Sequence, residues 1–316
     1  MKKALITGIA GFAGSHLADH LLAKNIKVFG FYHPNHSTSN VDHIKNKIQL
    51  FSVDLLNQKK TSDAVGEIKP DYVFHLAASS SPAQSFKNPG LTLENNLQSQ
   101  INLLEALVKI NSSAKILIVG SAEEYGIVEK KYDPVDEQTP IQPISPYAVS
   151  KVAQDFLGYQ YFMHYKLNIV RVRPFNHIGP RQSTDFVVPA FASQIVQIEK
   201  KGSGKIKVGN INSFRDFTDV RDVVRAYLLV LDKGEMGDVY NIGSGKLVQI
   251  ENVLKTLIAL SPAKIEITFD KSRLAPTEVK SITCNYSKLK QATGWKPEIP
   301  LSTTLFDTIN YEREKP

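Results

Sequence analysis

Tyr147 and Lys151 are the residues of this sequence whose types and spacing point most clearly to chemistry, because they stand four positions apart. In a helix, that spacing places both side chains on one face. A free phenol has a pKa of about 10, and an adjacent ammonium group stabilises the phenolate and lowers that pKa. Such a tyrosine can donate a proton to a carbonyl oxygen during reduction, or accept one from an alcohol.

A glycine-rich turn near the N-terminus predicts where a hydride carrier binds. Three glycines at intervals of three follow an expected strand, Lys3–Thr7, and open an expected helix, Gly14–Lys24. Glycine allows a tight turn and close approach of the backbone to phosphate, while the helix N-terminus faces the pyrophosphate of a dinucleotide. We expect Lys151, which stands four residues after Tyr147, to reach the nicotinamide ribose. The expected contacts in the turn are Gly8, Gly11, Phe12, Ala13 and Gly14.

Two further strand ends supply candidate cofactor contacts. Asp54 and Leu55 follow the third expected strand, where a carboxylate can accept the adenine amino group; a helix cap or a surface aspartate is the alternative. Small residues after the fourth strand let the chain pass close beside a dinucleotide. They lie in the stretch Leu76, Ala77 and Ala78, and the preceding His75 fits either a core or a site.

The end of the second strand, at His33 to His36, bears on the choice between NAD and NADP. An acidic residue there would bind the ribose hydroxyls of NAD, and an arginine would accept the 2′-phosphate of NADP. Neither is present, but His33, His36 and Ser37 can form hydrogen bonds with a phosphate. We therefore expect NADP(H) or NAD(H), with a slight lean to NADP(H).

Ser121 follows the buried strand expected at Lys115–Val119. A hydroxyl at that strand end can hydrogen-bond the substrate oxygen together with Tyr147, although a simple turn serine is the alternative. The three side chains Ser121, Tyr147 and Lys151 together predict a hydride-transfer enzyme.

The first half of the chain alternates short apolar strands with amphipathic helices, which predicts an α/β fold with a Rossmann-like, doubly wound parallel sheet. We expect residues 1–173 to form mainly the dinucleotide-binding domain, with a return segment at about 214–242. A smaller, discontinuous α/β lobe for the substrate would use mainly residues 174–213 and 243–316.

Composition narrows the class of protein further. The net charge of +7 fits either attraction to an anionic ligand or a lysine-rich surface. The lysines are spread along the chain without a nucleic-acid-binding motif, so no nucleic-acid partner is expected. No apolar run has the roughly 20 residues of a membrane span. Cys284 is the only cysteine, which suits a reducing cytoplasm. We expect no metal site.

The motifs resemble those of the extended short-chain dehydrogenases/reductases that act on nucleotide sugars, over nearly the whole chain. The second half is similar to GDP-4-dehydro-6-deoxy-D-mannose reductases. Ala275 departs from that pattern, which has a second arginine there. The matching stretches are Gly8–Gly14, His75–Ala78, Asn96 with Asn102, Ser121–Gly126, Tyr147–Lys151, Arg173–Gln182, Phe186–Pro189, Arg215–Asp222, Asp238–Gly245 and Arg273–Val279.

The resemblance implies further contacts. Asn96 and Pro174 would contact the cofactor, Asn176 the sugar or its diphosphate, and Val188 the nucleobase cleft. Arg215 and Arg273 would pair with the diphosphate, since guanidinium groups bind it in a bidentate manner, unless they form only surface ion pairs. Glu278 would touch a ribose hydroxyl or orient Arg273. Members are commonly homodimers built through two helices, here Leu91–Lys109 and Pro146–His164.

Glu123 leaves the reaction open. It stands where the 4,6-dehydratases of this superfamily carry a catalytic and substrate-contacting glutamate, while Ala122 stands where some of them carry an aspartate. We expect reduction of a GDP-linked 4-keto-6-deoxyhexose, giving GDP-D-rhamnose. The alternatives are a GDP-mannose 4,6-dehydratase, another nucleotide-sugar reductase or epimerase, and a catalytically silent cofactor-binding sensor.

Overall fold

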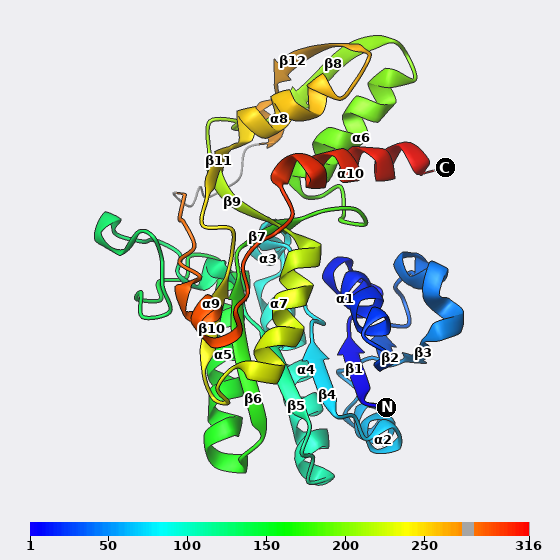
Figure 1. Cartoon of the computed structure of the whole chain (residues 1–316), viewed down its shortest axis with the longest axis vertical. Helices are drawn as coiled ribbons and strands as arrows, with labels where there is room; N and C mark the ends of the chain where they lie inside the picture. Colours follow the sequence, from blue (N-terminus) through cyan, green and yellow to red (C-terminus); the bar gives the residue numbers. More distant parts are fainter. Residues whose placement is uncertain (274–280, 316) are drawn as a thin grey trace.

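The computed structural model describes residues 1–273 and 281–315. Its centre is a sheet of seven parallel strands in the order β10-β6-β5-β4-β1-β2-β3. The expected Rossmann-like parallel sheet is therefore confirmed (Figure 1). The strands are β1 Lys3–Thr7, β2 Lys27–Tyr32, β3 Gln49–Ser52, β4 Tyr72–His75, β5 Lys115–Val119, β6 Asn168–Pro174 and β10 Val239–Ile242.

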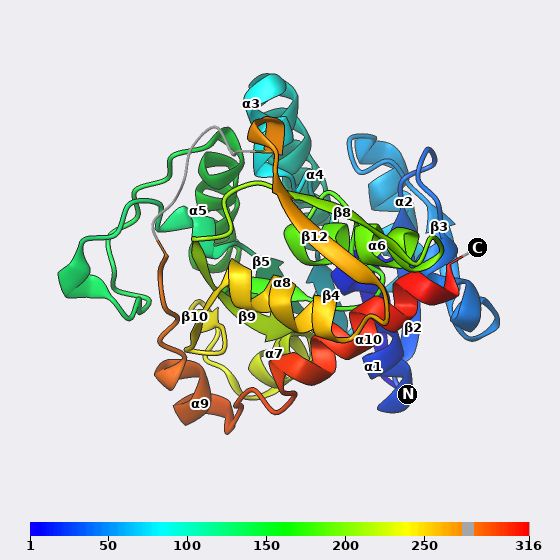
Figure 2. The same cartoon turned by 90° about the horizontal axis from the view of Figure 1, so that it is seen from above.

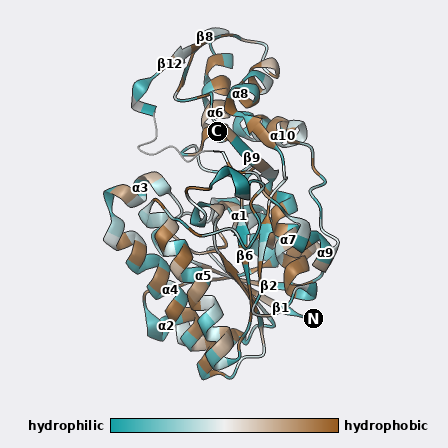
Figure 3. Cartoon of the chain, turned by 90° about the vertical axis from the view of Figure 1, so that its left-hand side faces the viewer, coloured by the Kyte–Doolittle hydropathy of each residue, from teal (hydrophilic) through white to brown (hydrophobic). Residues whose placement is uncertain are grey.

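Helices cover both faces of this sheet, as Figure 3 shows. One face packs against α1 and α7 and buries Leu17, Val224 and Trp295. The opposite face packs against α2, α4 and α5 and buries Leu104 and Ile118. The bounds are α1 Phe12–Ala23, α2 Gln58–Ile68, α3 Pro82–Lys87, α4 Pro89–Lys109, α5 Pro146–Tyr165, α7 Val220–Lys233 and α9 Ser287–Thr293, with 3-10 turns η1 Ser39–Lys47, η2 Ala122–Glu124 and η3 Lys130–Tyr132.

A second, smaller lobe lies beyond the carboxyl ends of the main strands (Figures 1 and 2). Its three helices pack on one another and on a two-stranded parallel sheet, around a core that includes Val188, Ile206 and Leu254. The elements are α6 Val187–Glu199, β8 Ser203–Val208, α8 Ile250–Ala259, β12 Lys264–Phe269, η4 Lys271–Arg273 and α10 Leu301–Glu314.

A three-stranded sheet, in the order β11-β9-β7, stands between the main sheet and the lobe (Figure 1). Its strands are β7 Asn176–Ile178, β9 Phe214–Asp219 and β11 Leu247–Gln249. Asp219 ends β9 and caps α7 by accepting a hydrogen bond from the backbone N–H of Arg221. The chain then returns to the main sheet through β10, beside β6, as the sequence predicted.

Some sequence-based bounds need correction. The helix after the glycine turn begins at Phe12 instead of Gly14, so Gly14 lies inside its first turn. The glycines at 202 and 204 predict a loop over Lys201–Lys205, but β8 begins at Ser203 and pairs with β12 from much later in the chain. Local sequence carries no signal for such a distant partner. Within the described ranges, no helix is long and apolar enough to cross a membrane.

Candidate active site

Tyr147 and Lys151 lie in the first two turns of α5, at the carboxyl end of β5. Ser145 caps the helix by accepting a hydrogen bond from the Ala148 N–H at 3.0 Å. Both site side chains are buried, with 8% of Tyr147 and 5% of Lys151 exposed. The Lys151 Nζ donates to the Val119 carbonyl at 2.8 Å and lies 6.0 Å from the centre of the Tyr147 ring. The ammonium is thereby fixed between the sheet edge and the phenol.

Ser121 reaches the same place from the strand side. It caps the short turn η2, where its Oγ accepts a hydrogen bond from the Glu123 N–H at 3.1 Å. A hydrogen bond between the Ser121 and Tyr147 side chains also works to lower the pKa of the phenol. The three predicted residues Ser121, Tyr147 and Lys151 are therefore brought together.

The electrostatics of this group differ from expectation. Burial raises the pKa of Tyr147 above its usual value, and Glu123 and Glu124 add to the rise. Burial lowers the pKa of Lys151 to about 8, against an opposing effect of Glu124. The expectation that Lys151 lowers the phenol pKa toward neutrality is therefore corrected, because desolvation dominates. At neutral pH Tyr147 keeps its proton, which is the state that a proton donor requires.

The glycine turn has the shape that a dinucleotide needs. Gly8 has φ +71°, and a Cβ on it would lie 3.0 Å from the Ala77 N and Cα atoms. A Cβ on Gly14 would overlap the carbonyl oxygen of Gly8. Gly11 precedes α1 without a side-chain cap, so the first N–H groups of the helix remain available to phosphate. The residues present therefore fit a dinucleotide pyrophosphate.

The Phe12 ring contacts the substrate side of the molecule. It stacks on His177 of β7, with 5.7 Å between ring centres and 7° between planes. Phe12 and the neighbouring Ala13 are both partly buried, in the first turn of α1. This stacking holds the glycine turn against the segment that leads from the main sheet to the lobe.

Asp54 and His33 lie together at the ends of β3 and β2. The Asp54 Oδ2 is 4.0 Å from the His33 Nε2, and both side chains are partly exposed. Leu55, by contrast, is buried in the core beneath them, and its carbonyl accepts a hydrogen bond from Asn102 at 2.8 Å. Polar groups suited to an adenosine moiety thus face outward at this edge.

Asn96 and His75 are supports within the fold. Asn96 is fully buried; its Oδ1 accepts from the Ser79 N–H at 2.7 Å, and its Nδ2 donates to the Ser150 Oγ at 2.9 Å. These bonds tie the loop through Leu76, Ala77 and Ala78 to α5, which corrects the expectation that Asn96 contacts the cofactor directly. His75 hydrogen-bonds Thr7 at 2.9 Å, and burial lowers its pKa to about 3, so it is a neutral core residue.

The substrate-side residues come from three neighbouring elements. Asn176 is exposed at the start of β7, two residues after the buried Pro174 that ends β6. Burial raises the pKa of Glu123, and Arg215 on β9 works against that rise. Since Glu123 also acts on Tyr147, this carboxylate lies near both Arg215 and the Tyr147 phenol.

Two further predicted substrate residues, Arg273 and Val188, belong to the lobe. Arg273 is partly exposed, 3.8 Å from Asp270. Val188 is fully buried in the lobe core, so its side chain has no free face for a base, and that expectation is corrected. Its neighbours Phe186 and Val187 are exposed instead. Glu278 lies outside the described residues.

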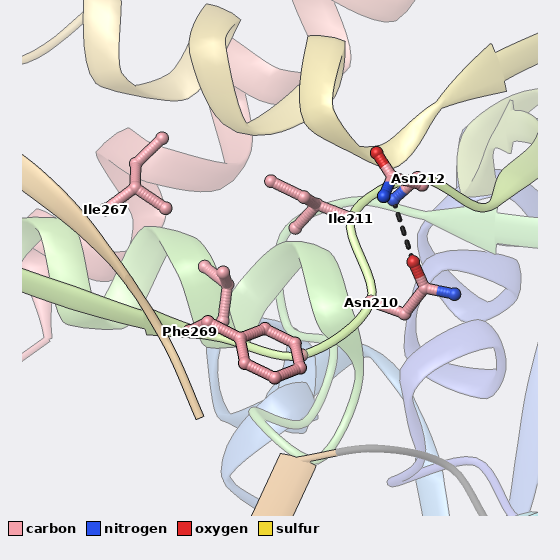
Figure 4. Close-up of a pocket in the computed structure, with 7 residues that line it drawn as sticks. Asn210, Ile211, Asn212, Ile267 and Phe269 are labelled. Carbon is pink, nitrogen blue, oxygen red and sulfur yellow. Dashed lines mark hydrogen bonds between the residues drawn. The ribbon is translucent and has the colours of Figure 1, made fainter. Parts of the chain in front are cut away.

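A cavity of about 390 Å³ opens in the smaller lobe (Figure 4). Ile267 and Phe269 of β12 form one wall, and the loop after β8 forms the other. The Asn212 N–H donates to the Asn210 Oδ1 at 3.0 Å across this loop. A Cβ on Gly209 would lie 2.5 Å from the Arg273 carbonyl, so the loop and η4 are in close contact. The cavity has the mixed apolar and amide lining that suits a heterocycle.

Sequence reasoning missed four buried charged residues around the site. Asp216 on β9 accepts hydrogen bonds from the N–H groups of Ser244, Gly245 and Cys284 at 2.8 to 3.0 Å, and so holds two loops beside Phe175. The other three, Glu124, Asp155 and Arg173, form a cluster behind Ser121. Two arginines, Arg171 and Arg173, inside the buried strand β6 were the signal available in the sequence.

The parallel sheet, the glycine turn and the Ser121, Tyr147 and Lys151 group define an extended short-chain dehydrogenase/reductase. Residues 5–308 match the family described as GDP-mannose 4,6 dehydratase, and the chain belongs to that family. It is 35% identical, over 96% of its length and 95% of the relative's, to a GDP-6-deoxy-D-mannose reductase of Pseudomonas aeruginosa.

Solved structures show the same architecture. The chain is similar to RMD from Pseudomonas aeruginosa complexed with NADPH, with a TM-score of 0.87, 33% identity and 99% of each chain covered. It is also similar to a Thermus thermophilus UDP-glucose 4-epimerase in complex with NAD, with a TM-score of 0.85, 28% identity and 99% of each chain covered. Neighbours of this fold thus carry either nicotinamide dinucleotide.

Proposed function

We propose that this chain reduces the C4 keto group of GDP-4-dehydro-6-deoxy-D-mannose with NADPH or NADH, giving GDP-D-rhamnose. The observation that carries the proposal is the buried Tyr147, which keeps its proton at neutral pH, hydrogen-bonds with Ser121 and lies beside Lys151. Similarity to the Pseudomonas aeruginosa GDP-6-deoxy-D-mannose reductase supports the choice of substrate.

The bound reduced nicotinamide supplies the hydride to C4. Tyr147 donates its proton to the C4 oxygen, and Ser121 holds that oxygen by a hydrogen bond. The Lys151 ammonium, fixed by the Val119 carbonyl, stabilises the phenolate that this transfer leaves. The phenolate regains a proton from solvent before the next turnover.

The two ends of the nucleotide sugar would contact different elements. Asn176 and Glu123 would contact the sugar, and Arg215 and Arg273 its diphosphate, since guanidinium groups match phosphate oxygens in a bidentate manner. The cavity at Ile267 and Phe269 would receive the nucleoside end. In this arrangement the sugar lies between the sheet domain, mainly residues 1–173, and the smaller lobe.

The cofactor would lie along the carboxyl ends of the strands. Gly8, Gly11, Phe12, Ala13 and Gly14 would hold its pyrophosphate, and Asp54 its adenine. The slight lean to NADP(H) rests on His33 and His36, whose ring centres are 5.0 Å apart at the end of β2.

Replacing both histidines, in the His33→Ala/His36→Ala variant, is expected to weaken NADPH binding about tenfold or more, because the 2′-phosphate loses its hydrogen bonds with the two imidazoles. Binding of NADH, which lacks that phosphate, should change much less. Isothermal titration of the wild type and the variant with both cofactors measures the difference. Equal losses of affinity for the two cofactors would contradict the assignment of these histidines.

Glu123 supports one other function, a GDP-mannose 4,6-dehydratase. Burial raises the pKa of this carboxyl group beside the site, which suits a group that moves protons. The family description also names that reaction. Dehydration would release water and regenerate the cofactor, whereas reduction consumes it.

One assay separates the two reactions. The purified chain is mixed with GDP-4-dehydro-6-deoxy-D-mannose and NADPH or NADH, and loss of nicotinamide absorbance is followed. Rapid oxidation with a GDP-6-deoxyhexose product supports reduction. No oxidation, together with conversion of GDP-mannose to a 4-keto sugar, would replace the proposal with the dehydratase.

The chain is further proposed to form a homodimer through α4 and α5. Val149, Phe156 and Met163 stand seven residues apart on α5, and each has an exposed side chain. Leu91 near the start of α4 is exposed as well. Exposed apolar side chains on two helices that pack against each other suit a symmetric helix–helix interface.

The Phe156→Glu variant is expected to raise the dimer dissociation constant by about 30-fold or more, because it places a charge in the centre of the interface. Phe306→Glu on α10 is the matched control, since Phe306 is about as exposed as Phe156, at 50% against 54%. Sedimentation velocity over a concentration series measures both. Equal dissociation constants for the two variants would place the interface elsewhere.

A further inference from the structure

Behind Ser121 lies a cluster of buried ionic groups that takes no direct part in the proposed reaction. Glu124 is fully buried, and its Oε1 accepts a hydrogen bond from the Ser121 N–H at 2.7 Å. Its other oxygen, Oε2, accepts from the Arg173 Nε at 3.0 Å. A Cβ on Gly120 would overlap this carboxylate, so the glycine leaves the room for it. Ser121, which carries the catalytic hydroxyl, is thus connected to Arg173 through the Glu124 carboxylate.

The same arginine is fastened to the helix that carries the other catalytic groups. The Asp155 Oδ2 accepts from the Arg173 Nε at 2.8 Å and lies 2.6 Å from the Arg173 Nη2. Asp155 follows Lys151 by four residues, as Lys151 follows Tyr147, so all three occupy one face of α5. The Asp155 Oδ1 accepts from Arg171 at 2.5 Å, so the Asp155 carboxylate lies between two guanidinium groups.

We infer that Glu124, Arg173 and Asp155 are positioning residues that set the placement of the Ser121 hydroxyl relative to the Tyr147 phenol. Ser121 sits at the end of β5 and Tyr147 in a different element, so their packing alone leaves the angle between the two hydroxyls adjustable. The contacts of Arg173 with Glu124 and with Asp155 connect the elements that carry Ser121 and Tyr147 through one planar guanidinium group of fixed geometry. This inference rests on the proposed function, because it assigns the two hydroxyls to one substrate oxygen.

A second contact makes the arrangement more rigid. The Arg173 Nη1 donates to the Tyr125 hydroxyl at 3.1 Å, and Tyr125 donates to the Asn241 Oδ1 of β10 at 2.7 Å. Arg173 therefore has partners on η2, on α5 and, through Tyr125, on the adjacent strand. A residue that only neutralised a buried charge would not need to connect the two elements that bear the catalytic hydroxyls.

The test is Arg173→Lys, which keeps the positive charge but replaces the separate Nε, Nη1 and Nη2 donors, with which Arg173 contacts Glu124, Asp155 and Tyr125, by a single nitrogen. We expect kcat for the nucleotide sugar to fall about 10- to 100-fold with KM and NADPH affinity nearly unchanged, as for a small misplacement of reacting groups. The matched control is Arg313→Lys in the lobe. Arg313 forks onto Glu199 with bonds of 3.0 and 2.7 Å.

A readout without turnover separates this inference from the proposed reaction. In protein labelled with ¹³Cζ-tyrosine, the Tyr147 resonance, assigned with Tyr147→Phe, reports its hydrogen bond with Ser121. It should move in Arg173→Lys and stay in place in Arg313→Lys. If the wild type reduces no GDP-sugar, the proposed function fails, and this resonance still decides whether the cluster sets the geometry.

Folding of the variant is checked by its melting temperature and its NADPH affinity. If Arg173→Lys does not fold, Glu124→Gln tests the same connection from the other end at nearly constant side-chain size. Its amide cannot accept from both Ser121 and Arg173, so the same loss of kcat and the same change in resonance are expected. Wild-type kcat, or an unmoved Tyr147 resonance, in a folded variant would overturn the inference.

Discussion

Replacing Tyr147 with phenylalanine is expected to lower kcat by about 10³-fold or more, while NADPH affinity stays within about twofold. The phenol is the buried proton donor at the site, and burial keeps its pKa above the usual value, so it remains protonated at neutral pH. Phenylalanine fills the same space, and it removes only the hydroxyl. The measurement is steady-state turnover of the 4-keto sugar, with cofactor binding followed by nicotinamide fluorescence.

Tyr161→Phe on the same helix is the control for loss of a buried tyrosine hydroxyl. Tyr161 is 5% exposed and donates to Glu105 at 2.5 Å, away from the catalytic group. The Tyr161→Phe variant should keep the wild-type kcat and have a slightly lower free energy of unfolding. If Tyr147→Phe retained kcat within about tenfold of the wild type, Tyr147 would not be the proton donor and the proposed mechanism would fail.

Local sequence patterns were sufficient to predict those strands that do not depend on one particular neighbouring strand. The strands Lys3–Thr7 and Lys115–Val119 have the bounds that their short apolar runs predicted. A buried parallel strand needs only apolar residues between turn signals, whichever strand lies beside it. The lobe lacks this independence, because β8 pairs with β12 across a long stretch of chain and both strands have exposed residues.

The residues of the candidate active site also differ in whether local sequence could predict them. Tyr147 and Lys151 were predictable because their spacing on one helix decides that they share a face. The contact between Arg173 and Glu124 joins residues 49 positions apart, and no short pattern in the sequence brings them together. The direction of the Tyr147 pKa shift was mispredicted for a related reason. The sequence shows which charges are near in the chain, whereas burial, the dominant cause here, is a property of the whole fold.

The second large effect is expected from Gly14→Ala, which should weaken NADPH and NADH binding by about 100-fold or more. The added Cβ would overlap the Gly8 carbonyl oxygen, so either α1 must move off the sheet or the glycine turn must open. Either shift removes the N–H groups of the helix N-terminus from the pyrophosphate, and both cofactors share that group. Isothermal titration with each cofactor measures the loss.

The matched control for this glycine is Gly66→Ala on α2, another helical glycine, where an added Cβ meets nothing within 4 Å. Alanine there should raise the free energy of unfolding by up to about 1 kcal/mol, because it restricts the unfolded chain and favours the helix. Cofactor affinity should not change. Gly14→Ala with wild-type affinity for both dinucleotides would show that the pyrophosphate does not lie over this turn. The assignment of Gly8, Gly11 and Gly14 to the cofactor would then be wrong, even though the fold around them is unchanged.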